Sequence, residues 1–249
     1  NFAMSFERPL VKPKFQNTYG GGSGYTWYAD GWSGTVDGFK GTAGTDESWG
    51  SPMDGRLVRE WYSGTEEVPL LPEPDNWEQW WETGKNTSTN VAITGGDEKS
   101  SFRLSVGRMD QEGIVYNNDY YRNNFRLNAT HHFLDNLSIT AMGEYVKSGS
   151  DNRSFLSNQS FIWHHRQTNF DQLKNWRDYT GVHIQRPGDT EPPNWQHTYF
   201  TNPYYLEEVV VRPNEKDRFL GNISLSYDII PGLNLMLRTG TDFWTDTRI

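Results

Sequence analysis

ITGGDEKSSFRLSVG, residues 93–107, is the stretch that decides the fold. After the turn at residues 95–98, apolar and polar side chains alternate, with Phe102, Leu104 and Val106 opposite Arg103 and Ser105. In a β-strand, successive side chains point to opposite faces, so this period of two predicts a strand with one apolar and one polar face. The Gly-Gly-Asp turn joins it to an earlier strand that contains Ile93.

The same alternation recurs along the chain. Its apolar sets run from Phe2 to Phe6, Val91 to Ile93, Phe102 to Val106, Tyr121 to Ala129, Leu137 to Tyr145, Phe219 to Tyr227 and Leu233 to Phe243. About seven strands, joined in sequence by hairpins, are predicted to form an antiparallel up-and-down sheet. The fold class is therefore all-β.

Composition excludes several classes of protein. With 34% hydrophobic residues and no run near the ~20 apolar residues of a spanning helix, a helical membrane protein is ruled out. The net charge of -9 argues against nucleic acid as a partner, which requires clustered Lys and Arg. The absence of Cys excludes disulfides, thiol catalysis and Cys-ligated metal.

The lengths of the connections alternate. In chain order they are predicted to be long, short, medium, short, long and short, at residues 8–87, 95–98, 108–118, 133–136, 149–217 and 228–232. A soluble sandwich has no reason to gather tight turns at one end, whereas a transmembrane β-barrel has short periplasmic turns and long extracellular loops. The pattern predicts a segment of such a barrel, with residues 8–87 and 149–217 outside the cell.

The aromatic residues support the same interpretation. Two girdles are predicted on the apolar face, an outer one of Tyr121, Tyr145, Phe219 and Phe243 and an inner one of Phe102, Phe133 and Tyr227. The opposite face carries mid-strand charges that a wet lumen tolerates and a dry core does not. The residues predicted to face the lumen are Arg103, Arg126, Glu144, Arg238 and Asp242.

One helix is expected in the loops. Asp75 can cap the stretch 76–83, and Gly84 would end it. The first residues already alternate as in a strand, so no signal peptide is expected, and we interpret the chain as a fragment or processed piece.

Several motifs resemble one family. The run from Asn76 to Gly84, the stretch 91–105 and the segment 110–115 resemble the first barrel strands of the SusC/RagA class of TonB-dependent outer-membrane transporters. Residues 15–22 and 202–204 are similar to loop motifs of that class. Thr94 stands where that class often has Ser.

The resemblance implies a location and partners. All 249 residues would form part of a larger, plugged barrel of roughly 22 strands in the outer membrane of a Gram-negative bacterium. The intact protein would import oligosaccharides or peptides, driven by the TonB complex through a plug region that this chain lacks. A SusD-class surface lipoprotein would act as a lid over the loops, and lipid would surround the barrel.

Residues of the second long loop are candidates for contact with substrate or lid. They are Trp163, His164, Arg166, Trp195, Tyr199 and Tyr204. Aromatic faces stack on sugars, and Arg and Tyr suit protein interfaces, but the same residues could simply pack the loops together. The sequence contains no catalytic motif. Adjacent His residues on an extended chain point apart, so they lack the spacing of metal ligands. No enzymatic activity, cofactor or metal is therefore predicted.

The alternative is a secreted all-β carbohydrate-binding module in which the strands form a sandwich. The two hypotheses differ in what covers the apolar face. A barrel leaves that face to lipid, and a sandwich shields it behind a second sheet. The residues that discriminate are Leu104, Leu127, Ile139, Ile223 and Leu235.

Overall fold

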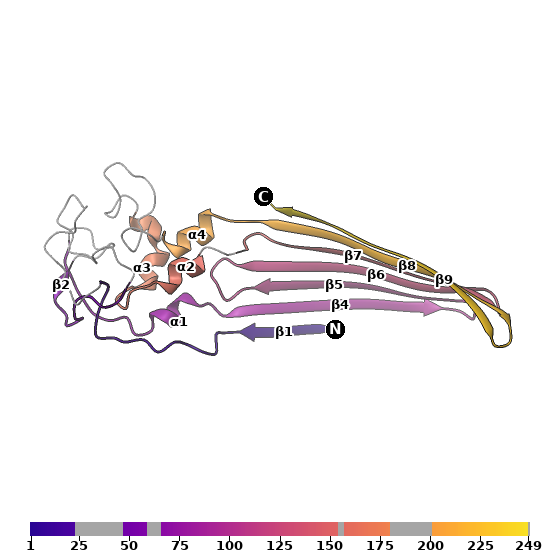
Figure 1. Cartoon of the computed structure of the whole chain (residues 1–249), viewed down its shortest axis with the longest axis horizontal. Helices are drawn as coiled ribbons and strands as arrows, with labels where there is room; N and C mark the ends of the chain where they lie inside the picture. Colours follow the sequence, from indigo (N-terminus) through magenta and orange to yellow (C-terminus); the bar gives the residue numbers. More distant parts are fainter. Residues whose placement is uncertain (23–46, 59–65, 154–156, 180–200, 249) are drawn as a thin grey trace.

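The computed structural model describes residues 1–22, 47–58, 66–153, 157–179 and 201–248. Long strands lie side by side as a curved sheet, with short helices and loops gathered at one end (Figure 1). Tight turns close the other end.

The sheet contains seven strands in the order β1-β4-β5-β6-β7-β8-β9, and every neighbouring pair is antiparallel. Their bounds are β1 Phe2–Glu7, β4 Gly84–Gly96, β5 Ser100–Glu112, β6 Asp119–Leu134, β7 Leu137–Ser150, β8 Asn214–Ile230 and β9 Leu233–Arg248. A two-stranded pair, β2 (Leu57–Val58) and β3 (Val68–Pro69), lies among the loops. The predicted antiparallel up-and-down sheet is confirmed.

The register separates the two faces of the sheet. One cross-strand row joins Val106, Phe125, Tyr145, Phe219 and Phe243. The neighbouring row on the other side of the pleat joins Ser105, Arg126, Glu144, Leu220 and Asp242. We call the first side the apolar face and the second the polar face.

Tight turns join β4 to β5, β6 to β7 and β8 to β9. In the first, the Asp97 carboxylate accepts hydrogen bonds from the backbone amides of Lys99, at 2.9 Å, and Ser100, at 2.7 Å. In the third, Gly232 has a φ of 89°, a conformation that suits glycine. These local contacts explain why the turn signals could be read from the sequence.

At the opposite end the connections are long and partly helical. The segments are α1 Asn76–Trp80, α2 Ser157–Ile162, α3 Phe170–Lys174, the 3-10 turn η1 Trp176–Tyr179, and α4 Pro203–Val209. The prediction of a single helix at 76–83 was therefore wrong in number and in extent. These helices are too short to show a helical period and depend on tertiary packing.

The strands also run further than predicted at this end. β4 begins at Gly84, within the predicted connection 8–87, and β8 begins at Asn214, within the predicted connection 149–217. Here both faces carry polar residues, for example Lys147 opposite Asp217. Backbone pairing continues where the hydrophobic alternation has stopped, so the pattern underestimates strand length.

The main hydrophobic core lies in the loops and not against the sheet. We call it the loop core, and its buried members are Trp80, Phe161, Phe170, Leu173, Trp176 and Tyr204. Trp80 is fully buried and stacks on Phe161, with ring centroids 5.1 Å apart. The loop core therefore joins α1, α2, α3 and α4 at the end of the sheet where the long connections meet.

Candidate functional site

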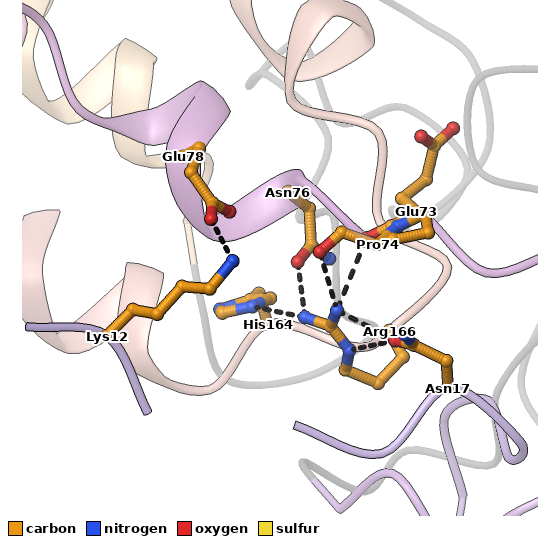
Figure 2. Close-up of polar contacts among 8 residues, drawn as sticks. All are labelled: Lys12, Asn17, Glu73, Pro74, Asn76, Glu78, His164 and Arg166. Atoms are coloured by element: carbon orange, nitrogen blue, oxygen red, sulfur yellow. Dashed lines mark hydrogen bonds and ion pairs between the residues drawn. The ribbon is translucent and has the colours of Figure 1, made fainter. Parts of the chain in front are cut away.

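Arg166 links three loop segments beside the loop core. Its Nε donates to the Gln16 carbonyl at 3.1 Å and its Nη2 to Asn17 Oδ1 at 2.9 Å. Its Nη1 donates to Asn76 Oδ1, and Nη2 also reaches the Pro74 carbonyl at 3.2 Å. Figure 2 shows the guanidinium group lying between Asn17, Asn76 and Pro74. Residues 16–17 and 73–76 are thus held to the segment after α2.

The charge of Arg166 is buried among neutral acceptors. The side chain is only 3% exposed, and its hydrogen-bond partners in the described residues include no carboxylate. The Phe15 ring lies 4.6 Å from the guanidinium carbon, an attractive cation–π geometry. Burial lowers the pKa of Arg166, and the nearby Glu78 charge raises it. Glu78 itself pairs with Lys12 (Figure 2).

His164 is a neutral member of the same cluster. It is 6% exposed, and its ring stacks on Phe161 at a centroid distance of 5.1 Å. Burial lowers its pKa to about 4. Nδ1 lies 2.7 Å from the Phe161 carbonyl, so this nitrogen carries the proton. Nε2 is then an acceptor and faces Arg166 Nη1 at 3.4 Å.

Two buried Asn residues complete the framework. Asn76 donates to the His165 carbonyl at 3.0 Å while it accepts from Arg166. Asn202 caps α4 by accepting from the Tyr204 amide at 2.9 Å, and it donates to the Leu173 carbonyl at 2.9 Å. The 202–204 motif therefore has a local physical role, because it starts a helix and ties it to α3.

The predicted contact residues of the second loop lie in different environments. Trp163 is 43% exposed, whereas His164, Arg166 and Tyr204 are buried in or beside the loop core. Burial raises the pKa of the Tyr204 hydroxyl. These three buried residues pack loops together, and contact with a substrate or lid stays a prediction. Trp195 and Tyr199 lie outside the described residues.

The five residues predicted to face the lumen all lie on the polar face. Arg103 is opposite Asn128, and Arg126 and Asp242 belong to the row that contains Glu144. Arg238 donates to Ser224 Oγ at 2.7 Å. Sequence reasoning missed further cations on this face, which are Arg122, Lys216, Arg218 and Arg248. Arg122 lies four residues from Arg126, and Arg218 lies two residues from Leu220. An even spacing along a strand places residues on the same face, so it would have indicated these two.

The polar face is the more crowded of the two. In the middle of the sheet, the buried residues Ser105, Gly107, Val146 and Ser224 all belong to it. Most of the large apolar side chains lie on the opposite face, although Trp244 belongs to the polar face.

Two kinds of feature are absent from the described residues. No helix among them is long and apolar enough to cross a membrane. In the same part of the chain, no group of three or more His, Asp or Glu residues is placed to hold a metal ion.

Comparison with known proteins gives a limited result. No protein-family profile matches the chain, and no curated protein matches it. Among solved structures, it is similar to the RagAB peptide importer in its open-open and closed-closed states and to a further structure of the RagAB peptide transporter. Each shows 17% identity and a TM-score of 0.47, covering 69% of this chain and 19% of the other.

The chain thus spans about a fifth of the length of those structures. The likeness is weak and partial. Membership of the transporter class stays a prediction.

Replacing Arg166 by Met should release the loop segments at 15–17 and 73–76. Several buried acceptors would lose their donor, at about 1–3 kcal/mol each. We expect the free energy of unfolding of the loop end to fall by at least about 3 kcal/mol, measured by hydrogen exchange of those amides. Arg177→Met is the control, because the Arg177 side chain is 62% exposed, and it should cost under about 1 kcal/mol. Equal effects of both variants would contradict the role of Arg166.

The stability of the loop end should fall on acidification. The folded pKa of His164 is about 4, below its ordinary value of 6.5. The unfolded state therefore binds the proton more readily, so the contribution is complete above pH 6.5 and is lost as pH falls toward 4. It is on the order of 3 kcal/mol. Tryptophan fluorescence during urea unfolding at pH 7 and pH 4.5 measures it. His164→Phe, which keeps an aromatic ring, should flatten the pH dependence, and an unchanged slope would show that another group titrates.

Proposed function

We propose that this chain is part of the wall of an outer-membrane β-barrel that imports oligosaccharides or peptides. The barrel segment extends over residues 1–249, and the helical end lies at the cell surface. The observation that carries the proposal is the exposed apolar face of the sheet. The importer acts without enzymatic chemistry, and TonB drives it through a plug region elsewhere in the longer protein.

The apolar face exposes large side chains in a continuous field. Examples are Val106 at 51%, Phe125 at 46% and Phe243 at 61% exposure. Soluble monomers rarely expose apolar patches above a few hundred Å². Lipid is the environment in which such a face is favourable.

Strand length supports a membrane setting. β4 to β9 contain between 13 and 17 residues each. A tilted strand needs about 9–11 residues to cross the hydrocarbon region. Each strand can therefore span a bilayer and extend past it on the side of the long loops, where both faces are polar.

The sandwich alternative requires a second sheet over the apolar face. None of the discriminating residues is buried, and they are Leu104, Leu127, Ile139, Ile223 and Leu235. Within the described ranges, no other sheet packs on that face, since β2 and β3 pair only with each other. The secreted carbohydrate-binding module is thus the less supported hypothesis.

The helical end supports an importer with an ordered outer surface. The loop core and Arg166 hold several long connections in one arrangement, which a docking surface for a SusD-class lipoprotein lid requires. Trp163 is exposed at this end and is our candidate for contact with the lid or the substrate. Both peptides and glycans fit an aromatic surface of this kind.

Charges introduced on the two faces should have opposite outcomes. Leu127→Arg places a cation on the lipid side of β6, at a cost of about 2–4 kcal/mol near the bilayer midplane. We expect strongly reduced assembly of the intact protein in outer-membrane fractions. Asn128→Arg, the next residue on the polar face, should assemble normally. Normal assembly of both variants would contradict a lipid-facing surface.

The lid assignment is tested separately in the intact transporter. Trp163→Ala should weaken association with the lipoprotein or lower uptake, because an exposed aromatic anchor is lost. Pull-down and uptake assays measure the two effects. Trp49→Ala, which removes another half-exposed Trp of the loop end, serves as the control. Unchanged association and uptake would reject Trp163 as a contact.

A further inference from the structure

We propose that the polar face of β5 and β6 binds the carboxylates of an extended acidic peptide through Arg103, Arg122 and Arg126. The inference rests on the proposed import function and adds to it a site and a ligand class. The three residues form what we call the arginine track. It runs along the long axis of the sheet, from near the loop end toward the tight turns.

The track consists of three exposed arginines. All three side chains are exposed, and among the described residues none forms a hydrogen bond or an ion pair. Glu144 lies directly opposite Arg126 in the register but makes no ion pair with it. Of the three, only Arg126 has a carboxylate directly opposite it in the register.

Other cations on the polar face are engaged. Arg218 pairs with Asp242 at 2.5 Å, and Arg248 pairs with Asp246 at 2.9 Å. Lys216 lies over the Trp244 ring, 4.3 Å from its centroid. Among the described residues of the polar face, the arginines without an ion pair or hydrogen bond therefore lie on β5 and β6. The net charge of the whole chain is -9.

The sheet surface beside the arginine track carries small or polar residues. Ser105 is 8% exposed, and Gly107 has no side chain. Asn124 lies over Gly107, since a Cβ there would be 2.3 Å from Asn124 Oδ1. Ligand groups can therefore approach the guanidinium groups along this surface, where the Ser105 hydroxyl and the Asn124 amide are further hydrogen-bond partners.

The spacing matches an extended peptide. Arg122 and Arg126 are four residues apart on one strand, about 13 Å at roughly 3.3 Å per residue. Arg103 pairs opposite Asn128 and so lies one strand over and two residues further along, about 8 Å from Arg126. A peptide in strand conformation presents alternate side chains at the same period. Acidic residues at positions i, i+4 and i+6 would face all three cations.

Arginine is suited to this task. Its planar fork matches both oxygens of a carboxylate, which favours carboxylate over hydroxyl groups of neutral sugars. An acidic segment of the longer protein could occupy the same face. We take the imported peptide as the occupant because the track continues toward the loop end, where substrate would enter.

The test uses the intact transporter in detergent and a fluorescent peptide with Glu at positions i, i+4 and i+6. A peptide with Gln at those positions is the neutral control, and one with Glu at i, i+3 and i+5 splits the charges between two sides. We expect the first peptide to bind roughly tenfold tighter than both controls, an advantage that falls as salt is raised.

Replacing Arg103, Arg122 and Arg126 together by Gln should remove this preference, while replacement by Lys should retain part of it. Arg108→Gln is the matched control, because Arg108 lies on the opposite face of β5 and pairs with Asp110. If the triple variant does not fold, Arg126→Gln alone should weaken binding about twofold to threefold.

Equal binding of the Glu and Gln peptides would overturn the inference. A triple Gln variant that loses thermal stability but keeps the preference for the Glu peptide would also overturn it. In that case an acidic segment of the protein itself would occupy the arginine track. Failure of the proposed function would appear separately, as normal assembly of both the Leu127→Arg and the Asn128→Arg variants, which would contradict the membrane setting.

Discussion

The alternation of side chains across one seven-stranded antiparallel sheet is the constraint on which the structure depends. Because each strand pairs with the next strand of the same sheet along the chain, each strand repeats the same choice of face. The row through Phe125 and Phe243 is apolar from strand to strand, and the adjacent row through Arg126 and Asp242 is polar. A slip of one residue in any pair would place charges among the apolar side chains.

The same ladder separates tight turns from long connections. Turns such as the one at Asp97 need only local hydrogen bonds, so that end is short. The long connections must satisfy their own polar groups, and they do so through a separate hydrophobic core and through Arg166, Asn76 and Asn202. The molecule thus has a sheet stabilised by pairing and a loop end stabilised by packing.

Sequence predicted the first of these parts far better than the second. Period-two alternation and Gly-containing turns are local signals, so strand number, order and the faces of Arg103 and Glu144 followed from them. Of the short helices only α1 was expected, because α2, α3 and α4 depend on packing against the loop core. Nothing in the sequence near Arg166 announces partners about 90 and 150 residues away.

The central claim is that the apolar face meets lipid and the polar face meets water. The chain contains no Cys, so single labels can be placed at Leu127→Cys and Asn128→Cys on β6. Nitroxide labels at both sites, in the intact protein reconstituted into bilayers, report collisions with oxygen and with a water-soluble nickel complex. The account predicts oxygen-dominated relaxation at position 127 and nickel-dominated relaxation at position 128. Nickel access at both positions, or shielding of position 127 from both reagents, would contradict it.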